Sequence, residues 1–183
     1  MFNINNIRVG RLNNYKNNSG KFCFINYFHD DNDLSKDLSA DNTKFNLIKN
    51  EDKLIINLPK SRVAFDTNLD YDKPNLFINL NNKDLISFNN SLKDIIINSV
   101  YNINLYGKDL ETLAKFYNDP IQIKQKTGKK LLKLKILKQR LASPIDILQK
   151  GSMVNLNIHV SGIWFNGENF GPYYNIVDLK KLN

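Results

Sequence analysis

The chain has 183 residues, which is enough for one domain with a substantial apolar interior. Hydrophobic residues make up 42% of it, which excludes a wholly disordered chain, and no apolar run approaches the ~20 residues that cross a bilayer. The net charge of +8 favours polyanionic partners, although an AT-rich genome would enrich Lys and Asn without any selection for binding. The start, MFNINNIRVG, lacks the layout of a signal peptide, so we expect an intracellular protein without membrane contact.

The first segment, IRVGRLNNYKNNSGKFCFINYF, predicts a β-hairpin. A short alternating run and a second run rich in aromatics flank a polar stretch, in which Ser19-Gly20 is the expected turn. Cys23 lies between two phenylalanines, and one Cys with two His offers neither an internal disulfide nor the ligand set of structural zinc. We therefore expect a packing thiol, a reducing compartment and no metal site.

An acidic loop is expected at about 29–43, where HDDNDLSKDLSADN is short of apolar residues. Loose carboxylates of this kind are typical of a solvated loop rather than of a dedicated cation site. They are Asp30, Asp31, Asp33, Asp37 and Asp41. The next segment, FNLIKNEDKLIINLPKSRVAF, predicts two or three short strands, interrupted at 50–52 and at Pro59, because proline cannot donate to a β-ladder.

A helical insertion is expected over about 83–118. In DLISFNNSLKDIIINSVYNINLYGKDLETLAKFYNDP the apolar residues recur at spacings of three and four, which is typical of a helix packed on a sheet. Gly107 divides the segment, and Pro120 ends the pattern of its second half, KDLETLAKFYN, which is the more regular one. The expected apolar face of that half consists of Leu110, Leu113, Ala114 and Tyr117.

A lysine-rich hairpin is predicted after the insertion. In IQIKQKTGKKLLKLKIL a turn at Thr127-Gly128 joins two runs that both have period two. A helix through LLKLKILKQRL is the alternative, because Leu, Lys and Gln are good helix formers. In the preferred hairpin, one side carries Ile121, Ile123, Leu132, Leu134 and Ile136.

The closing segment, GSMVNLNIHVSGIWFNGENFGPYYNIVDLKKL, predicts a long strand, a turn at Asn166-Gly167 and a final strand. The apolar residues of 154–160 should face inward. Continued alternation would then place Gly162 and Trp164 inward and Phe165 outward, unless the glycine introduces a bulge.

The catalytic search finds no phosphate-binding loop, no dinucleotide glycine fingerprint, and no HExxH, GxSxG or CxxC motif. His29 and His159 have no local partners. We therefore expect no enzyme, no catalytic residue and no cofactor. A nucleic-acid enzyme that uses the acidic loop is the weakest alternative.

The basic residues concentrate where the predicted hairpin lies. They are Lys124, Lys126, Lys129, Lys130, Lys133, Lys135, Lys138 and Arg140. Lys133 and Lys135 would share a face without an acidic residue between them, a ridge that could follow phosphates, although a solubilising face would have the same composition. A weaker patch in the first hairpin consists of Arg8, Arg11, Lys16 and Lys21.

Aromatic side chains complete a candidate interface for unpaired bases. Stacking on a sheet surface contributes ~1–3 kcal/mol per base and needs no particular base sequence. Strand parity favours Phe165, together with Phe170 and Tyr173, whereas Trp164 has an equal expectation of lying in the core. Lysines and aromatics together predict single-stranded nucleic-acid binding, and stacking alone does not distinguish DNA from RNA.

The pattern PIDILQKGSMVNLNIHVSGIWFNGENFGPYYNIVDLKKL resembles the closing OB-fold strands of single-stranded-DNA-binding replication proteins from phages, large DNA viruses and linear plasmids. The shared features are Gly151-Ser152 before an alternating strand, the turn at Asn166-Gly167, and the run Ile176-Val177-Asp178-Leu179.

The resemblance implies one domain over 1–183, a five-stranded Greek-key barrel with an added hairpin and one or two helices. It also implies non-sequence-specific binding of single-stranded DNA in a basic groove during replication or recombination of viral or plasmid DNA. Many members recruit replication proteins through an acidic tail, whereas this chain stops at VDLKKLN, which leaves the acidic loop as a substitute. The alternative is a structural or protein-interaction domain, such as a virion or assembly component.

Overall fold

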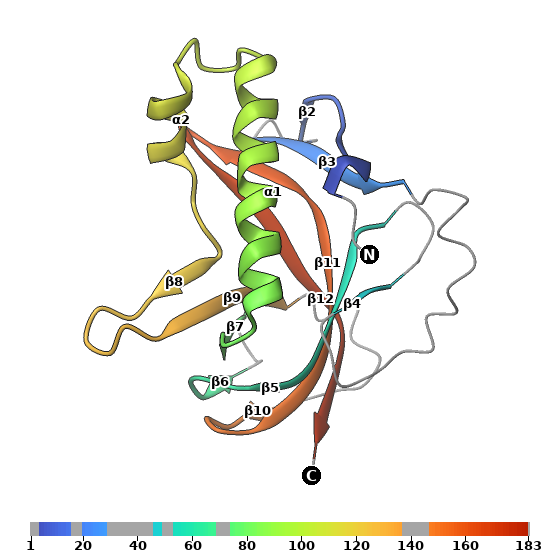
Figure 1. The fold of residues 1–183 in the computed structure, drawn as a ribbon, viewed down its shortest axis with the longest axis vertical. Helices are drawn as coiled ribbons and strands as arrows, with labels where there is room; N and C mark the ends of the chain where they lie inside the picture. The colour runs from blue at the N-terminus through green and yellow to red at the C-terminus, as the bar shows by residue number, and fades with distance from the viewer. Residues whose placement is uncertain are drawn as a thin grey trace.

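The computed structural model describes residues 4–15, 20–28, 46–48, 53–68, 74–136 and 147–182. Within these ranges the fold is mainly β with two helices, which confirms the predicted β fold with a helical insertion (Figure 1). The predicted acidic loop, Ser19 and Arg140 lie outside the described residues. The elements are η1 (Ile4–Asn6), β1 (Ile7–Val9), β2 (Asn13–Asn14), β3 (Lys21–Tyr27), β4 (Asn46–Ile48), β5 (Ile55–Arg62), β6 (Thr67–Asn68), β7 (Asn75–Asn79), α1 (Lys83–Asn102), α2 (Leu110–Phe116), β8 (Ile121–Ile123), β9 (Lys130–Ile136), β10 (Ile147–Leu148), β11 (Met153–Asn166) and β12 (Asn169–Leu182).

The hairpin of β11 and β12 lies at the centre of a mixed sheet. Each strand has 14 residues, and the turn between them contains Gly167, whose φ of 59° is positive. The other edge of β11 pairs with β5 along its first half and with β3 along its second half. β12 pairs in parallel with β9, which pairs antiparallel with both β7 and β8. Segments far apart in the sequence therefore share one sheet.

The predicted N-terminal hairpin is confirmed, because β1 and β2 both pair antiparallel with β3. Cys23, on β3, is only 1% exposed, and burial raises the pKa of its thiol. A buried neutral thiol contributes apolar packing and not reactivity. Cys23 is thus the packing thiol that the sequence predicts.

β5 runs through Pro59, so the predicted interruption there is wrong. The pairing of β5 with β11 shifts by one residue between Val154 and Leu156, which places a bulge at Pro59 and Lys60. Lys60 has a positive φ of 47°, and its backbone N–H donates to Asn155 Oδ1 at 2.9 Å. The bulge accommodates the missing proline N–H without ending the strand.

Two helices lie within the predicted helical segment, but the longer one is α1, so the prediction that the second half forms the more regular helix is wrong. α1 has 20 residues and begins after Asn82, whose side chain accepts the Leu85 N–H at 2.9 Å. α2 has only seven residues and ends at Phe116, and Leu110 of its predicted apolar face is 42% exposed. So short a helix presents little more than Leu113 to the core. Neither helix of the described part is long and apolar enough to cross a membrane.

The lysine-rich segment forms the predicted hairpin of β8 and β9, and the alternative helix is excluded over 130–136. Gly128, in the connection, has a φ of 64°, which favours glycine. Leu132 and Leu134 are 0% exposed, as predicted. Ile123, however, is 63% exposed, because the hairpin projects away from the rest of the sheet at this end (Figure 1).

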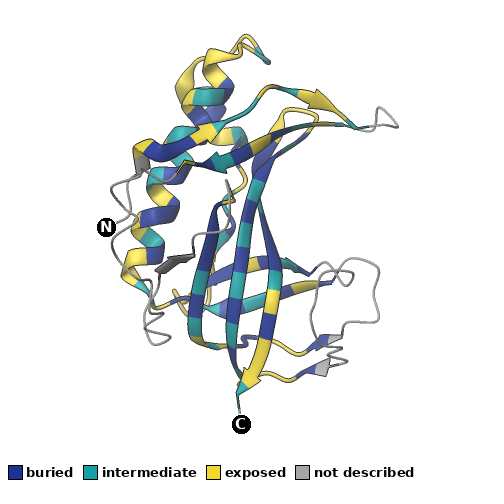
Figure 2. Cartoon of the chain, turned by 90° about the vertical axis from the view of Figure 1, so that its right-hand side faces the viewer, coloured by how far each residue is buried: buried dark blue, intermediate teal, exposed yellow. Residues whose placement is uncertain are grey.

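A bulge in β11 reverses the predicted inside and outside of its second half. The pairing with β12 shifts between Val160 and Gly162, so the alternation slips by one residue. Phe165 is only 5% exposed, whereas Trp164 is partly exposed. This is the opposite of what continued alternation predicts, and it is the result expected if Gly162 introduces a bulge. A Cβ at Gly162 would lie 2.2 Å from the Cys23 carbonyl oxygen. Figure 2 shows the alternation of buried and partly buried residues along the long strands.

Candidate nucleic-acid interface

Two lysines of β9 lie on the face opposite to the buried Leu132 and Leu134. Lys133 is exposed and lies directly across from Phe77 of β7. Lys135 is partly buried and lies across from Asn75 of β7 and Asn175 of β12. Directly paired residues share a face of the sheet, so these side chains form one surface. None of these paired neighbours is acidic, as the sequence predicts.

Two phenylalanines flank this lysine ridge. Phe65 follows β5 and is 38% exposed, and its ring centre lies 5.7 Å from that of Phe77 in an edge-to-face arrangement. Lys124 places its Nζ atom 5.3 Å from the centre of the Phe65 ring. We define the β7–β9 face as Phe65, Phe77, Lys124, Lys133 and Lys135. It combines flat apolar rings with cations, which is the chemistry that unpaired bases and their phosphates need.

Phe65 and Phe77 are absent from the set of residues that the sequence predicts for the site. The alternation of PNLFINL contains a usable signal for Phe77, because it lies between two residues that are buried, Leu76 and Ile78. Phe65 has no such signal. It meets Phe77 because the Ala64 N–H donates to the Phe77 carbonyl at 2.8 Å, a contact between distant segments.

Tyr173, a predicted stacking residue, lies on β12 beside the lysine ridge. Lys135 places its Nζ atom 5.2 Å from the centre of the Tyr173 ring, and the Tyr173 hydroxyl forms a hydrogen bond with that of Tyr15. Burial, followed by this hydrogen bond, raises the pKa of Tyr173, so the phenol stays neutral. A neutral ring held by two partners is a rigid stacking surface.

Further aromatic side chains continue the surface across β11 to β3. Phe24 pairs with Gly162, which pairs with Tyr173, and Phe22 pairs with Trp164 in the next row. Phe24 is 54% exposed, and its ring centre lies 5.0 Å from that of Phe22. We define the aromatic row as Tyr15, Phe22, Phe24, Trp164 and Tyr173. Trp164 therefore lies on the surface side and not in the core.

Phe165 and Phe170 are not available to a ligand, so their predicted stacking role is wrong. Phe165 is 5% exposed and Phe170 is 0% exposed, and their ring centres lie 6.1 Å apart in a stacked arrangement. Phe170 also meets the ring of Tyr117 edge to face. The bulge next to Gly162 turns Phe165 into the core, and Phe170 has the parity of the buried Tyr174 and Ile176 on β12.

The remaining predicted basic residues are distributed over several surfaces. Lys126, Lys129 and Lys130 are exposed around the β8–β9 connection. Arg8, on β1, pairs with Asn26 on the same face as the aromatic row, and its guanidinium donates to the backbone carbonyls of Asn5 and Ile7. Two of the other three predicted members of the N-terminal patch do not join that face: Arg11 lies in the connection after β1, and Lys21 has the parity of Cys23. The third, Lys16, lies outside the described residues.

The described ranges hold no group of three or more His, Cys, Asp and Glu side chains that could bind a metal ion. His159 lies within β11, and His29 is outside these ranges. No protein-family model matches the chain, and the comparison with curated proteins finds no match either.

Proposed function

We propose that the protein binds single-stranded DNA without sequence preference through the β7–β9 face. The observation that carries the proposal is the placement of Phe65 and Phe77 beside Lys124 and Lys133 on one exposed surface. Bases stack on the rings, while the lysines neutralise phosphates and release counterions. RNA would meet the same groups, because none of them reads the sugar.

The order of strand pairing supports an OB-like barrel. From β5 the pairing leads to β7, β9, β12 and β11, and β11 pairs with β5 again. The step from β5 to β7 is the bridge between Val63 and Ile78 just after β5. We propose these five strands as the barrel, with the β1–β3 hairpin as an addition. The β7–β9 face would then be the face of the second and third strands, where OB-folds bind oligonucleotides.

The biological role proposed here is protection of exposed strands during replication or recombination. The resemblance of the closing hairpin to phage, viral and plasmid single-stranded-DNA-binding proteins supports this role. The aromatic row adds support, since it extends the stacking surface from Tyr173 to Phe24 without interruption by a carboxylate.

The test is the anisotropy of a labelled oligo-dT at several salt concentrations, with unlabelled double-stranded DNA and RNA as competitors. We expect affinity that falls steeply with salt and duplex DNA that competes poorly. Phe77→Leu, which keeps an apolar side chain but removes the flat ring, should weaken binding, while Leu110→Ala on the remote α2 should not. Equal competition by duplex DNA, or binding indifferent to salt, would refute the proposal.

A structural or protein-interaction domain is the second candidate. Phe24 and Phe28 are 54% and 49% exposed, and exposed apolar groups of this size also fit a protein partner. If the protein is such a domain, a Lys133→Glu/Lys135→Glu double variant should keep its binding to the protein partner. If the β7–β9 face binds DNA, the same variant should lose its affinity for DNA.

A further inference from the structure

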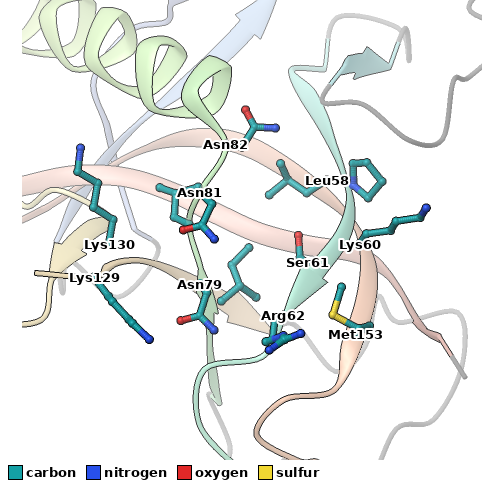
Figure 3. Close-up of a pocket in the computed structure, with 13 residues that line it drawn as sticks. Leu58, Lys60, Ser61, Arg62, Asn79, Asn81, Asn82, Lys129, Lys130 and Met153 are labelled. Carbon is teal, nitrogen blue, oxygen red and sulfur yellow. The ribbon is translucent and has the colours of Figure 1, made fainter. Parts of the chain in front are cut away.

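A cavity of about 610 Å³ opens beside the β7–β9 face (Figure 3). Its walls come from β5, from the connection between β7 and α1, and from the start of β9. The bulge at Pro59 and Lys60 contributes to the β5 wall. These segments are far apart in the sequence, so tertiary structure creates the cavity.

Of the described residues that line the cavity, four are cationic and none carries a carboxylate. They are Lys60, Arg62, Lys129 and Lys130. Figure 3 shows two of them on β5 and two on the β8–β9 hairpin, with asparagines between them. All four are exposed, and none forms an ion pair with another residue of the described ranges. Four unpaired positive charges around one hollow attract an anion.

The other lining residues indicate a ligand larger than a bare phosphate. The volume lies within the range of about 300–1,000 Å³ that is common for small-molecule sites. Met153 is partly exposed and offers apolar surface to a base, whereas the lining residues Leu58 and Leu80 are buried. Asn79 and Asn81 supply amides that both donate and accept hydrogen bonds. A phosphate, a base and its polar edge thus each have matching groups.

The cavity is continuous with the proposed binding face. Asn79 lies two residues beyond Phe77 on the same face of β7, a separation of about 6.6–6.8 Å along a strand. Lys130 begins β9 three residues before Lys133 and has the parity of Leu132 and Leu134, so it lines the cavity from the opposite face of that strand. A DNA strand that stacks on Phe77 can therefore reach the cavity with its next nucleotide.

We propose that this cavity receives one nucleotide of the bound strand, with its phosphate held by Arg62, Lys129 and Lys130. This inference rests on the proposed function. The ligand is a nucleoside phosphate, which a strand provides either at an internal position or at a phosphorylated 5′ end. Lys60, at the bulge, adds charge at the rim.

The experiment compares the parent protein with Arg62→Gln and with Lys129→Gln/Lys130→Gln. Lys108→Gln, on the loop before α2, is the matched control for the Arg62 variant, because it loses one exposed cation far along the chain from the cavity. The probes are oligo-dT with a 5′ hydroxyl, the same oligo-dT with a 5′ phosphate, and circular single-stranded DNA. We expect Arg62→Gln to weaken binding about tenfold, since a charge-assisted contact is lost, and each lost contact to make the salt slope shallower by about 0.7.

Equal weakening on all three probes assigns the cavity to an internal nucleotide, and loss of a preference for the 5′ phosphate alone assigns it to a strand end. Either outcome supports the proposal. Cavity variants that match the parent on every probe, while Phe77→Leu binds more weakly, would overturn the cavity and leave the proposed function intact. A parent protein that binds none of the probes would overturn both. Thermal melting of each variant checks that it is folded.

Discussion

Replacing two lysines of the β7–β9 face tests the proposed interface most directly. In Lys124→Gln/Lys133→Gln both side chains are exposed, so the free energy of unfolding should change by less than about 0.5 kcal/mol. Lys124 lies over Phe65 and Lys133 opposite Phe77, so each is placed to meet a phosphate next to a stacked base. The double variant therefore removes two cations without removing the stacking rings.

The expected magnitude follows from counterion release. Each phosphate contact on a single strand contributes about 0.7 to the slope of log K against log salt, so the slope of the double variant should be shallower by about 1.4. Over a fourfold rise in salt, the parent should therefore lose about sevenfold more affinity than the variant.

Anisotropy titrations of labelled oligo-dT at four or more salt concentrations measure both slopes. The control is Lys108→Gln/Lys115→Gln, which has the same net charge but loses its lysines on the helical segment, where Lys115 forms only an exposed pair with Glu111. An unchanged slope in the double variant would refute the assignment of the face. The same change of slope in the control would show that net charge alone decides binding.

Three further predictions concern the fold that holds the site. Gly162→Ala should destabilise the protein by about 1–3 kcal/mol in chemical denaturation, because the new Cβ would lie 2.2 Å from the Cys23 carbonyl oxygen, whereas Gly10→Ala, with its nearest contact at 3.5 Å, should be nearly neutral. Burial raises the pKa of Tyr117, Tyr173 and Tyr174 above the ordinary value of 10.0, so their contribution to stability is complete below pH 10 and is lost as the pH rises further; the last phenols to ionise should do so together with unfolding, and ionisation of all eight tyrosines in an intact fold near pH 10 would contradict this. The Cys23 thiol, 1% exposed, should react with a thiol reagent only at the rate of unfolding, and rapid modification of the native protein would show that β3 opens locally.

Local sequence patterns were sufficient to predict most of the helices and strands. The period of two on either side of Thr127-Gly128 predicts the β8–β9 hairpin, and the same period places Leu132 and Leu134 inside and Lys133 outside. The spacing of three and four predicts α1, and the Asn166-Gly167 dipeptide predicts the turn between β11 and β12. These features depend on residues that are near one another in the chain, so the sequence contains them directly.

The sequence was a poorer guide to which aromatic side chains face the core and which face the surface. Alternation across Gly162 places Phe165 outside, but the pairing of β11 with β12 shifts between Val160 and Gly162, and Phe165 turns inward. β3 lies close against β11 at the same glycine. Whether a glycine continues a strand or starts a bulge depends on the neighbouring strand, which local periodicity does not reveal. Pro59 is a similar case, since a bulge opposite Asn155 keeps β5 intact.

The sequence by itself determined the kinds of element, the outward lysines of β9 and the buried thiol, because each follows from a period or from composition along a few residues. Only the tertiary structure decided that Phe65 and Phe77 lie beside those lysines, that Trp164 faces outward, and that Arg62, Lys129 and Lys130 line one cavity. The physical reason is strand pairing. The ladder between β7 and β9, the bridge that joins β5 to β7 and the bulge at Gly162 bring distant segments together, and side-chain neighbours across a sheet are set by that register rather than by order in the chain.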